Sequence, residues 1–324
     1  MISVATEYRR AGREPRAPDS VCYVCPRCHD TLALEHGELV CAACAGRYRL
    51  ADAAYVDFAG PGLDFDDWWM QTPELQAQWL ATKAPREEEF QLGGAQRYTL
   101  PLLRRLGLAP GATVLSAACG LAADVQYFND QGYNAWGIDL GSRILRWSER
   151  RCRVRLSRAD LFALPFAEAS FDYVQCLNVI EHIGTVGDTT TVTEDYEAQR
   201  IAAIGSLLRV VKPGGYLLLS GVNRTFPIDF FHLQHSGPLR LHSPWEQFSL
   251  NCHDYQKLAD ATGYAEWTRP LPLRGFFSWT HLRRRPLVRP ILPLANWALG
   301  CMPDAFYGSP LSFFSVVLIR RKAI

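Results

Sequence analysis

Residues 113–125 read Thr-Val-Leu-Ser-Ala-Ala-Cys-Gly-Leu-Ala-Ala-Asp-Val, and this stretch decides the fold of the chain. The apolar pair at 114–115 predicts a buried parallel strand. The residues that follow, 117–122, are mostly small, so a ligand can approach the backbone closely. Gly120 can also adopt dihedral angles that other residues avoid. The run 124–129 then predicts the start of a crossover helix.

A second apolar run, Ala135–Ile138, ends in Asp139. The chain therefore predicts a strand, a tight turn, a helix, a second strand and an acid, in that order. An acid at the tip of the second strand can accept hydrogen bonds from both hydroxyls of a ribose. The dinucleotide fingerprint G-x-G-x-x-G is absent, which argues against NAD or FAD as the ligand. An α/β domain without a cofactor is the alternative.

This stretch resembles the cofactor site of class I S-adenosylmethionine-dependent methyltransferases. Cys119 and Gly120 match the first motif of that family. Ser116 stands where the family usually has an acid, and Ala118 and Ala122 stand where it usually has glycines. The resemblance implies a Rossmann-like α/β sheet of seven strands, the last of them antiparallel.

Further motifs of the same family follow in order. Asp160 and Leu161 resemble the pair that contacts the adenine ring. Residues 178–182, Asn-Val-Ile-Glu-His, resemble a motif of the subfamily that acts mostly on small molecules and lipids. The resemblance covers residues 106–222. It implies that S-adenosylmethionine is bound by Ser116, Ala118, Cys119, Gly120, Asp139, Leu140, Asp160, Leu161 and Asn178.

The remaining core elements are expected from apolar runs and turns. Strands are predicted over 152–156, 173–177, 216–220 and 313–319, and helices over 142–150 and 201–211. Lys212-Pro-Gly-Gly215 predicts the turn before the strand at 216–220.

Near the N-terminus, Cys25 and Cys28 form one C-x-x-C pair, and Cys41 and Cys44 form a second. This spacing favours a tetrahedral zinc site in which two turns supply four thiolates, so the zinc is expected to be structural. A small hairpin between the pairs and a closing strand around Tyr48 would make residues 21–60 a zinc ribbon. The alternatives are four unrelated cysteines, or Cys22 as a ligand in place of Cys25.

The composition is that of an ordinary globular protein. The chain has 324 residues, of which 48% are hydrophobic, and a net charge of +1. A protein that coats nucleic acid by charge alone would be more basic, so nucleic acid is the less favoured partner. Residues 1–20 lack the apolar segment of a secretory signal and are expected to be a disordered tail. We expect no transmembrane segment, contact with a membrane surface at most, and a cytoplasmic location.

The other segments are assigned from their composition. Residues 61–105 are expected to be a helical linker that either covers the cofactor or substrate pocket or packs on the sheet or the ribbon. Residues 106–324 are the expected methyltransferase domain, with a substrate-binding insertion at about 223–310. Within that insertion, the basic run His281–Arg285 precedes an apolar segment. This run could bind an anionic lipid head group or a phosphorylated carrier, form a lid on a hydrophobic pocket, or pack on its own sheet.

His182 is the leading candidate for a catalytic base, because it follows the fourth strand where the sheet opens toward a substrate. A purely structural hydrogen bond is the alternative. Other histidines, His232, His235, His242 and His253, follow the fifth strand. The sequence thus predicts a methyltransferase for a small-molecule, sugar or lipid-linked acceptor. The other hypotheses are an RNA methyltransferase and a non-catalytic, methyltransferase-like partner protein. The oligomeric state is left open.

Overall fold

The protein is described from a computed structural model that covers residues 21, 23–51, 55–59, 70–187, 189–232, 240–277 and 290–323. The N-terminal strands are β1 (Leu32–Glu35), β2 (Glu38–Cys41), β3 (Arg47–Ala51) and β4 (Tyr55–Asp57). The later strands of the large sheet are β5 (Thr113–Ala117), β6 (Asn134–Asp139), β7 (Leu156–Arg158), β8 (Phe171–Leu177), β9 (Val211–Val222), β12 (Ala265–Pro270) and β13 (Phe314–Arg321). A separate two-stranded sheet pairs β10 (Ile228–Asp229) with β11 (Arg240–Leu241).

The α-helices of the described residues are α2 (Pro73–Thr82), α3 (Ala84–Gly94), α4 (Leu100–Arg105), α5 (Ala123–Asp130), α6 (Tyr196–Val210), α7 (Cys252–Ala261), α9 (Leu292–Cys301) and α10 (Asp304–Tyr307). A π-helical turn, η3 (Ala95–Thr99), joins α3 to α4. The 3-10 helices are η4 (Ser142–Glu149), η5 (Arg153–Arg155) and η6 (Ile180–His182). Within the described part of the chain, no helix is long and apolar enough to cross a membrane.

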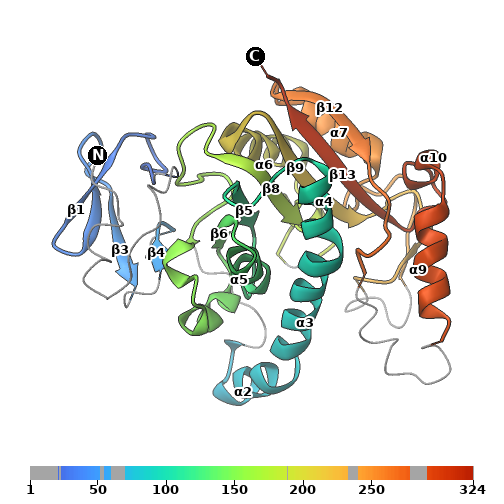
Figure 1. Ribbon diagram of the computed structural model, residues 1–324, viewed down its shortest axis with the longest axis horizontal. Coiled ribbons are helices and arrows are strands. Elements are labelled where there is room, and N and C mark those ends of the chain that lie inside the picture. Colours follow the sequence, from blue (N-terminus) through green and yellow to red (C-terminus); the bar gives the residue numbers. More distant parts are fainter. Residues whose placement is uncertain are drawn as a thin grey trace.

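Seven strands form the predicted core of the sheet, in the order β7-β6-β5-β8-β9-β13-β12 (Figure 1). The five from β7 to β9 run parallel to their neighbours, whereas β13 is antiparallel to β9. This arrangement confirms the expected α/β sheet with an antiparallel last strand. β12 lies inside the range 223–310 that we predicted as an insertion, and it pairs with β13 at the end of the sheet.

Helices cover both faces of this sheet. Successive strand residues point to opposite faces, so apolar residues at neighbouring positions pack in two separate cores. Leu115, Val174 and Val317 pack in one core with residues of α6 and α7. Their neighbours Val114, Tyr173 and Val316 pack in a second core with residues of η3, α4 and α5. The parallel strands are therefore buried on both faces, as their continuous apolar runs predict.

The N-terminal strands extend the same sheet. β4 pairs in parallel with β7, with Val56 opposite Ser157. The ring of Tyr23 stacks on Phe166 with ring centroids 5.5 Å apart, and its hydroxyl lies 2.6 Å from the hydroxyl of Ser157. The predicted hairpin forms as β1 and β2, and β3 is the predicted closing strand. The cysteine-bearing segment and the large sheet consequently share one hydrophobic core.

Most predicted strands and helices are present, with shifts at their ends. The predicted strand at 152–156 is wrong: residues 153–155 form η5, and the strand begins at Leu156. Arginines at 153 and 155 are exposed or half-buried there, whereas Leu156 is buried. The predicted tail, Cys22, His235 and the basic run 281–285 lie outside the described residues.

Candidate functional site

The loop between β5 and α5 has the backbone of a glycine-rich turn. Ala118, Gly120 and Ala122 all have φ between +52° and +57°. Left-handed backbone suits glycine and is strained for alanine. The two alanines therefore occupy the conformations for which the family uses glycine, and the loop keeps the shape of the motif without its usual residues.

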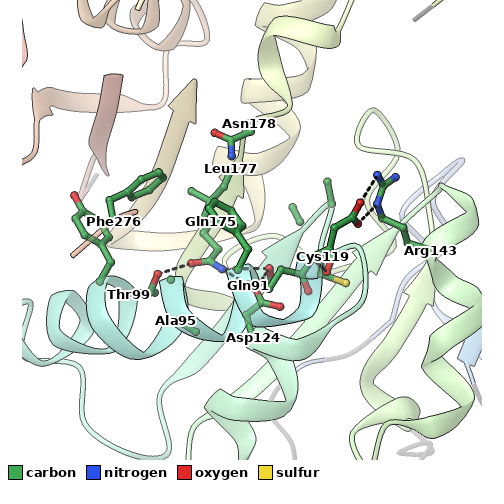
Figure 2. Close-up of a pocket in the computed structure, with 17 residues that line it drawn as sticks. Gln91, Ala95, Thr99, Cys119, Asp124, Arg143, Gln175, Leu177, Asn178 and Phe276 are labelled. Carbon is green, nitrogen blue, oxygen red and sulfur yellow. Dashed lines mark hydrogen bonds and ion pairs between the residues drawn. The ribbon is translucent and has the colours of Figure 1, made fainter. Parts of the chain in front are cut away.

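A cavity of about 310 Å³ opens beside this loop, at the carboxyl ends of β5 and β8 (Figure 2). Four of the predicted cofactor residues line it: Ser116, Ala118, Cys119 and Asn178. The predicted residues Gly120, Asp139, Leu140, Asp160 and Leu161 are not among the residues that line it. Ligands of open α/β sheets bind at this edge of the sheet, and this volume lies at the lower end of the range for small-molecule sites.

A buried polar network forms the floor of the cavity. The hydroxyl of Ser116 donates to Oδ2 of Asp124 at 2.5 Å, and the amide of Gln175 donates to the same oxygen at 2.8 Å. Thr99 donates in turn to Gln175, as Figure 2 shows. Among the described residues, the other oxygen of Asp124 has no hydrogen-bond partner. Burial raises the pKa of Asp124, although the bonds from Ser116 and Gln175 oppose that rise.

Asp124 is a residue whose role the sequence did not reveal. It lies in the first turn of α5, eight positions after Ser116, yet the fold brings its carboxylate to the serine hydroxyl. The carboxylate of Asp124 therefore lies beside position 116, where the resemblance leads one to expect an acid. The available signal was an acid in the first turn of the crossover helix, where the helix dipole favours a negative charge.

Asp139, at the tip of β6, holds two loops together. Its carboxylate accepts hydrogen bonds from the backbone N–H groups of Gly120 and Gly141, each at 2.7 Å. Burial raises its pKa, and the two amides oppose this rise. The predicted role of Asp139 as a ribose acceptor stays a prediction.

The two residues predicted to contact adenine follow β7, which is the neighbour of β6 in the sheet. Asp160 and Leu161 follow β7, are half-buried, and do not border the cavity. Oδ1 of Asp160 accepts the backbone N–H of Phe162 at 3.0 Å. The residues that the resemblance assigns to the cofactor therefore lie at or just after the ends of four adjacent parallel strands, β7, β6, β5 and β8.

Helix α3 lies over the glycine-type loop. The amide of Gln91 donates to the carbonyl of Cys119 at 3.1 Å and accepts the N–H of Ala123 at 3.3 Å. Glu87 of the same helix pairs with Arg143 at 2.8 Å. Residues of α3, among them Glu87 and Gln91, also line the cavity, and the role of residues 61–105 as a pocket cover stays a prediction. η3 and α4 pack in the second hydrophobic core.

The predicted base, His182, belongs to a cluster at the end of β8. Its Nε2 lies 3.3 Å from Nε2 of His232, and Nδ1 of His232 lies 2.8 Å from Asp229. Glu181 is 1% exposed, and burial raises its pKa to about 7. The sequence named His232 among several histidines but could not show that it meets His182, since fifty positions separate them. His242 lies near Glu246, 3.2 Å from its carboxylate, and His253 is exposed on α7.

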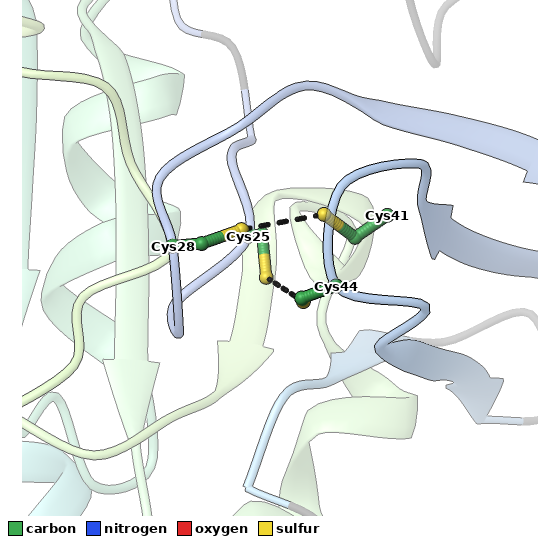
Figure 3. Close-up of side chains that lie close together, drawn as sticks. All are labelled: Cys25, Cys28, Cys41 and Cys44. Carbon is green, nitrogen blue, oxygen red and sulfur yellow. Dashed lines mark hydrogen bonds between the residues drawn. The ribbon is translucent and has the colours of Figure 1, made fainter.

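The four predicted metal-ligating cysteines converge (Figure 3). The sulfur atoms of Cys25 and Cys44 lie 3.5 Å apart, and those of Cys28 and Cys41 lie 3.4 Å apart. A disulfide needs about 2.05 Å, whereas thiolates around a tetrahedral Zn²⁺ lie about 3.8 Å apart. The cysteines are free thiols at nearly the second spacing, so the cluster can hold one tetrahedral metal ion.

Comparison with known proteins agrees with this geometry. Residues 115–219 match the protein family described as a methyltransferase domain. The chain is similar to the malonyl-[acyl-carrier protein] O-methyltransferase of Pseudescherichia vulneris, with 28% identity over 162 residues, covering 50% of this chain and 55% of that protein. It is also similar to the ubiquinone biosynthesis O-methyltransferase of Pseudomonas paraeruginosa, with 28% identity over 171 residues, covering 51% of this chain and 65% of that protein.

Both matches span less than two thirds of the curated relatives' own length. Among solved structures, the chain resembles one from a complex between the Haloferax volcanii Trm112 methyltransferase activator and a putative methyltransferase. That likeness has 13% identity and a TM-score of 0.48, and it covers 76% of this chain and 96% of that chain.

We predict that Ala118→Gly raises the free energy of unfolding by about 0.5–1 kcal/mol. Left-handed backbone costs a non-glycine residue about 1–2 kcal/mol, which outweighs the extra entropy of glycine in the unfolded chain, about 0.5–1 kcal/mol. Chemical denaturation measures the change. Ala202→Gly, on an exposed position of α6, is the matched control and should instead lose about 1 kcal/mol. Equal losses in the two variants would contradict the assigned strain.

Proposed function

Because residues 115–219 form a class I S-adenosylmethionine-dependent methyltransferase domain, we propose that this protein transfers a methyl group to a small-molecule or lipid-linked acceptor with an apolar part. The observation that carries the proposal is the cavity beside the β5–α5 loop, with the unpartnered, buried oxygen of Asp124 in its wall. When bound, S-adenosylmethionine supplies an electrophilic methyl group on a sulfonium centre.

The chain offers groups for each end of that cofactor. The free oxygen of Asp124 suits the ammonium of the methionine end, since a buried carboxylate oxygen needs a donor. Asp139 and Asp160 follow neighbouring strands and are our candidates for the ribose and the adenine. Asn178, which lines the cavity from the end of β8, lies on the side where η6 brings His182 toward an acceptor.

Aromatic rings run from the cavity toward the surface and support an acceptor with an apolar part. Phe276 lines the cavity, and its ring centroid lies 5.2 Å from that of Phe277. Phe277 stacks on Phe231 with centroids 5.8 Å apart, and Phe231 is 44% exposed. An isoprenoid or acyl chain could lie along these rings, since its burial is favourable by about 25 cal/mol per Å². The relative named for ubiquinone biosynthesis is consistent with this class of acceptor.

We further propose that the four clustered cysteines hold a structural Zn²⁺. All four ligands come from the protein, which leaves no open position for chemistry. Two matching turns present them: the N–H of His29 bonds to the carbonyl of Cys25 at 2.8 Å, and that of Ala45 bonds to the carbonyl of Cys41 at 2.9 Å. The hydroxyl of Tyr48 lies 3.1 Å from the sulfur of Cys25 and so orients it from outside the cluster.

We predict that Asp124→Asn weakens S-adenosylmethionine binding, measured by calorimetry, by roughly 10- to 150-fold. This range corresponds to the loss of one charged hydrogen bond, about 1.5–3 kcal/mol. Asparagine keeps the size of the side chain and an oxygen that accepts from Ser116, so the fold should persist. Asp130→Asn, the same change on the exposed end of α5, is the control and should bind as the wild type does.

The pH dependence of binding gives a second readout for Asp124. Because burial raises its pKa, the carboxylate takes up a proton at a higher pH than an ordinary aspartate. Wild-type affinity should therefore fall as the pH is lowered through that range, while the Asp124→Asn variant loses this part of the dependence. Unchanged affinity in the variant at every pH would place the ammonium group elsewhere.

Phe231→Ala should lower kcat/KM for hydroxylated aromatic acceptors with an isoprenoid tail more than for the same rings without a tail. Removing the ring takes away apolar contact area that only the tail can use. Release of S-adenosylhomocysteine, followed by mass spectrometry, measures the rates. Equal effects on tailed and tail-less acceptors would show that the aromatic surface does not hold the tail.

Cys44→Ser should lower the midpoint of thermal unfolding by several degrees and remove bound zinc, because the free energy of metal binding contributes to the stability of the folded state. Cys301→Ser is the matched control, since Cys301 is another exposed free thiol outside the cluster. Metal analysis and thermal unfolding of both variants test this. Identical zinc content in the two would contradict the assignment of the ligands.

A further inference from the structure

A second group of metal-ligating side chains lies beside the cofactor cavity. Glu181 and His182 lie in η6, which begins three residues after the end of β8. His232 lies three residues after Asp229, the last residue of β10. One carboxylate oxygen and two imidazole nitrogens of these three residues lie within 4.8 Å of one another. Asn178, four positions before His182, lines the cavity itself.

The distance between the facing ring nitrogens of His182 and His232 is that of two ligands of one metal ion. Their Nε2 atoms face each other at 3.3 Å. Two nitrogens bound to one Zn²⁺ at about 2.0–2.1 Å with tetrahedral angles lie about 3.3–3.4 Å apart. The two rings therefore need little movement to share an ion.

The orientation of His232 is fixed by a buried carboxylate. Its Nδ1 lies 2.8 Å from Oδ2 of Asp229, whose side chain is fully buried. The backbone N–H groups of Phe231 and His232 donate to the other oxygen of Asp229, and Arg240 donates to Oδ2 at 3.0 Å. An Nδ1–H held in this way directs the lone pair of Nε2 at His182, which is the arrangement that metal-binding histidines use.

Glu181 supplies the negative charge. Its side chain is buried, and among the described residues one of its carboxylate oxygens has no hydrogen-bond partner. Arg200 lies close but donates to the main-chain carbonyl of Glu181. A Cβ on Gly221 would lie 3.1 Å from both carboxylate oxygens, so the glycine leaves the room that this side chain fills. A hydrogen bond between the two histidines would still leave one oxygen of this buried carboxylate without a donor, whereas a shared cation accounts for all three groups.

We propose that Glu181, His182 and His232 bind one divalent transition-metal ion, with Zn²⁺ as the reference ion, separately from the four cysteines. Two neutral imidazoles and one carboxylate leave a Zn²⁺ with a net charge of +1 and an open coordination position. His182 is then a metal ligand instead of the base that the sequence predicts. An acceptor hydroxyl bound at the open position gives up its proton to solvent more readily, which prepares its oxygen to attack the methyl group. This use of the ion rests on the proposed methyl transfer, but its binding does not.

Metal content per chain tests the proposal on the full-length protein. After equilibration with buffered Zn²⁺ and removal of free ion, the wild type should hold one equivalent of zinc beyond that held by the cysteines. His182→Ala and His232→Ala should each lose this second equivalent, with a dissociation constant raised roughly 100-fold or more. His253→Ala, on an exposed position of α7, should keep it. Cobalt substitution adds a spectroscopic readout, since a nitrogen and oxygen site lacks the thiolate charge-transfer bands of the cysteine site.

The outcomes separate this proposal from the proposed function. Circular dichroism establishes that each variant folds, and Glu181→Gln provides a third variant in which little volume changes. A wild type that holds only the zinc of the cysteines, or histidine variants that keep the second equivalent, would overturn the metal site. Cofactor binding measured in the same samples decides independently whether the methyltransferase assignment stands.

Discussion

The two hydrogen bonds that Asp139 accepts from Gly120 and Gly141 tie the loop after β5 to the loop after β6. Both loops end parallel strands at the same edge of the sheet, so this one carboxylate sets their spacing. Helix α3 then closes over the first loop through Gln91, and η4 begins directly after the second. The cavity, its cover and the strand ends around it all depend on this junction.

The carboxylate of Asp124 illustrates how a fold tolerates a changed motif. Position 116 carries a serine, but Asp124 supplies an acid at the same point in space from the next helix. Gln175 of β8 and Thr99 of η3 complete the network, so three elements support the carboxylate. The geometry that matters is the position of the charge at the strand end and not the sequence position from which it comes.

The sequence predicted the sheet well where apolar runs are clear, as at β6 and β8. It missed the true bounds of β7, because only three residues pair there and arginines precede them. β12 and α7 were hidden inside a segment with mixed composition. The tight loop between β5 and α5 was predictable from small residues at fixed spacing. The contact between His182 and His232 was not predictable, since it depends on how the segment after β9 folds back onto the end of β8.

The cluster of four cysteines was predictable, because the two members of each pair lie close together in the chain. The attachment of the cysteine-bearing segment to the larger domain was not predictable, since it arises from the parallel pairing of β4 with β7. That pairing covers the backbone edge of β7, which would otherwise present free N–H and carbonyl groups beside the loop that carries Asp160. An uncovered edge of this kind invites pairing with other chains. The cysteine-bearing segment therefore also shields the larger domain from aggregation at this edge.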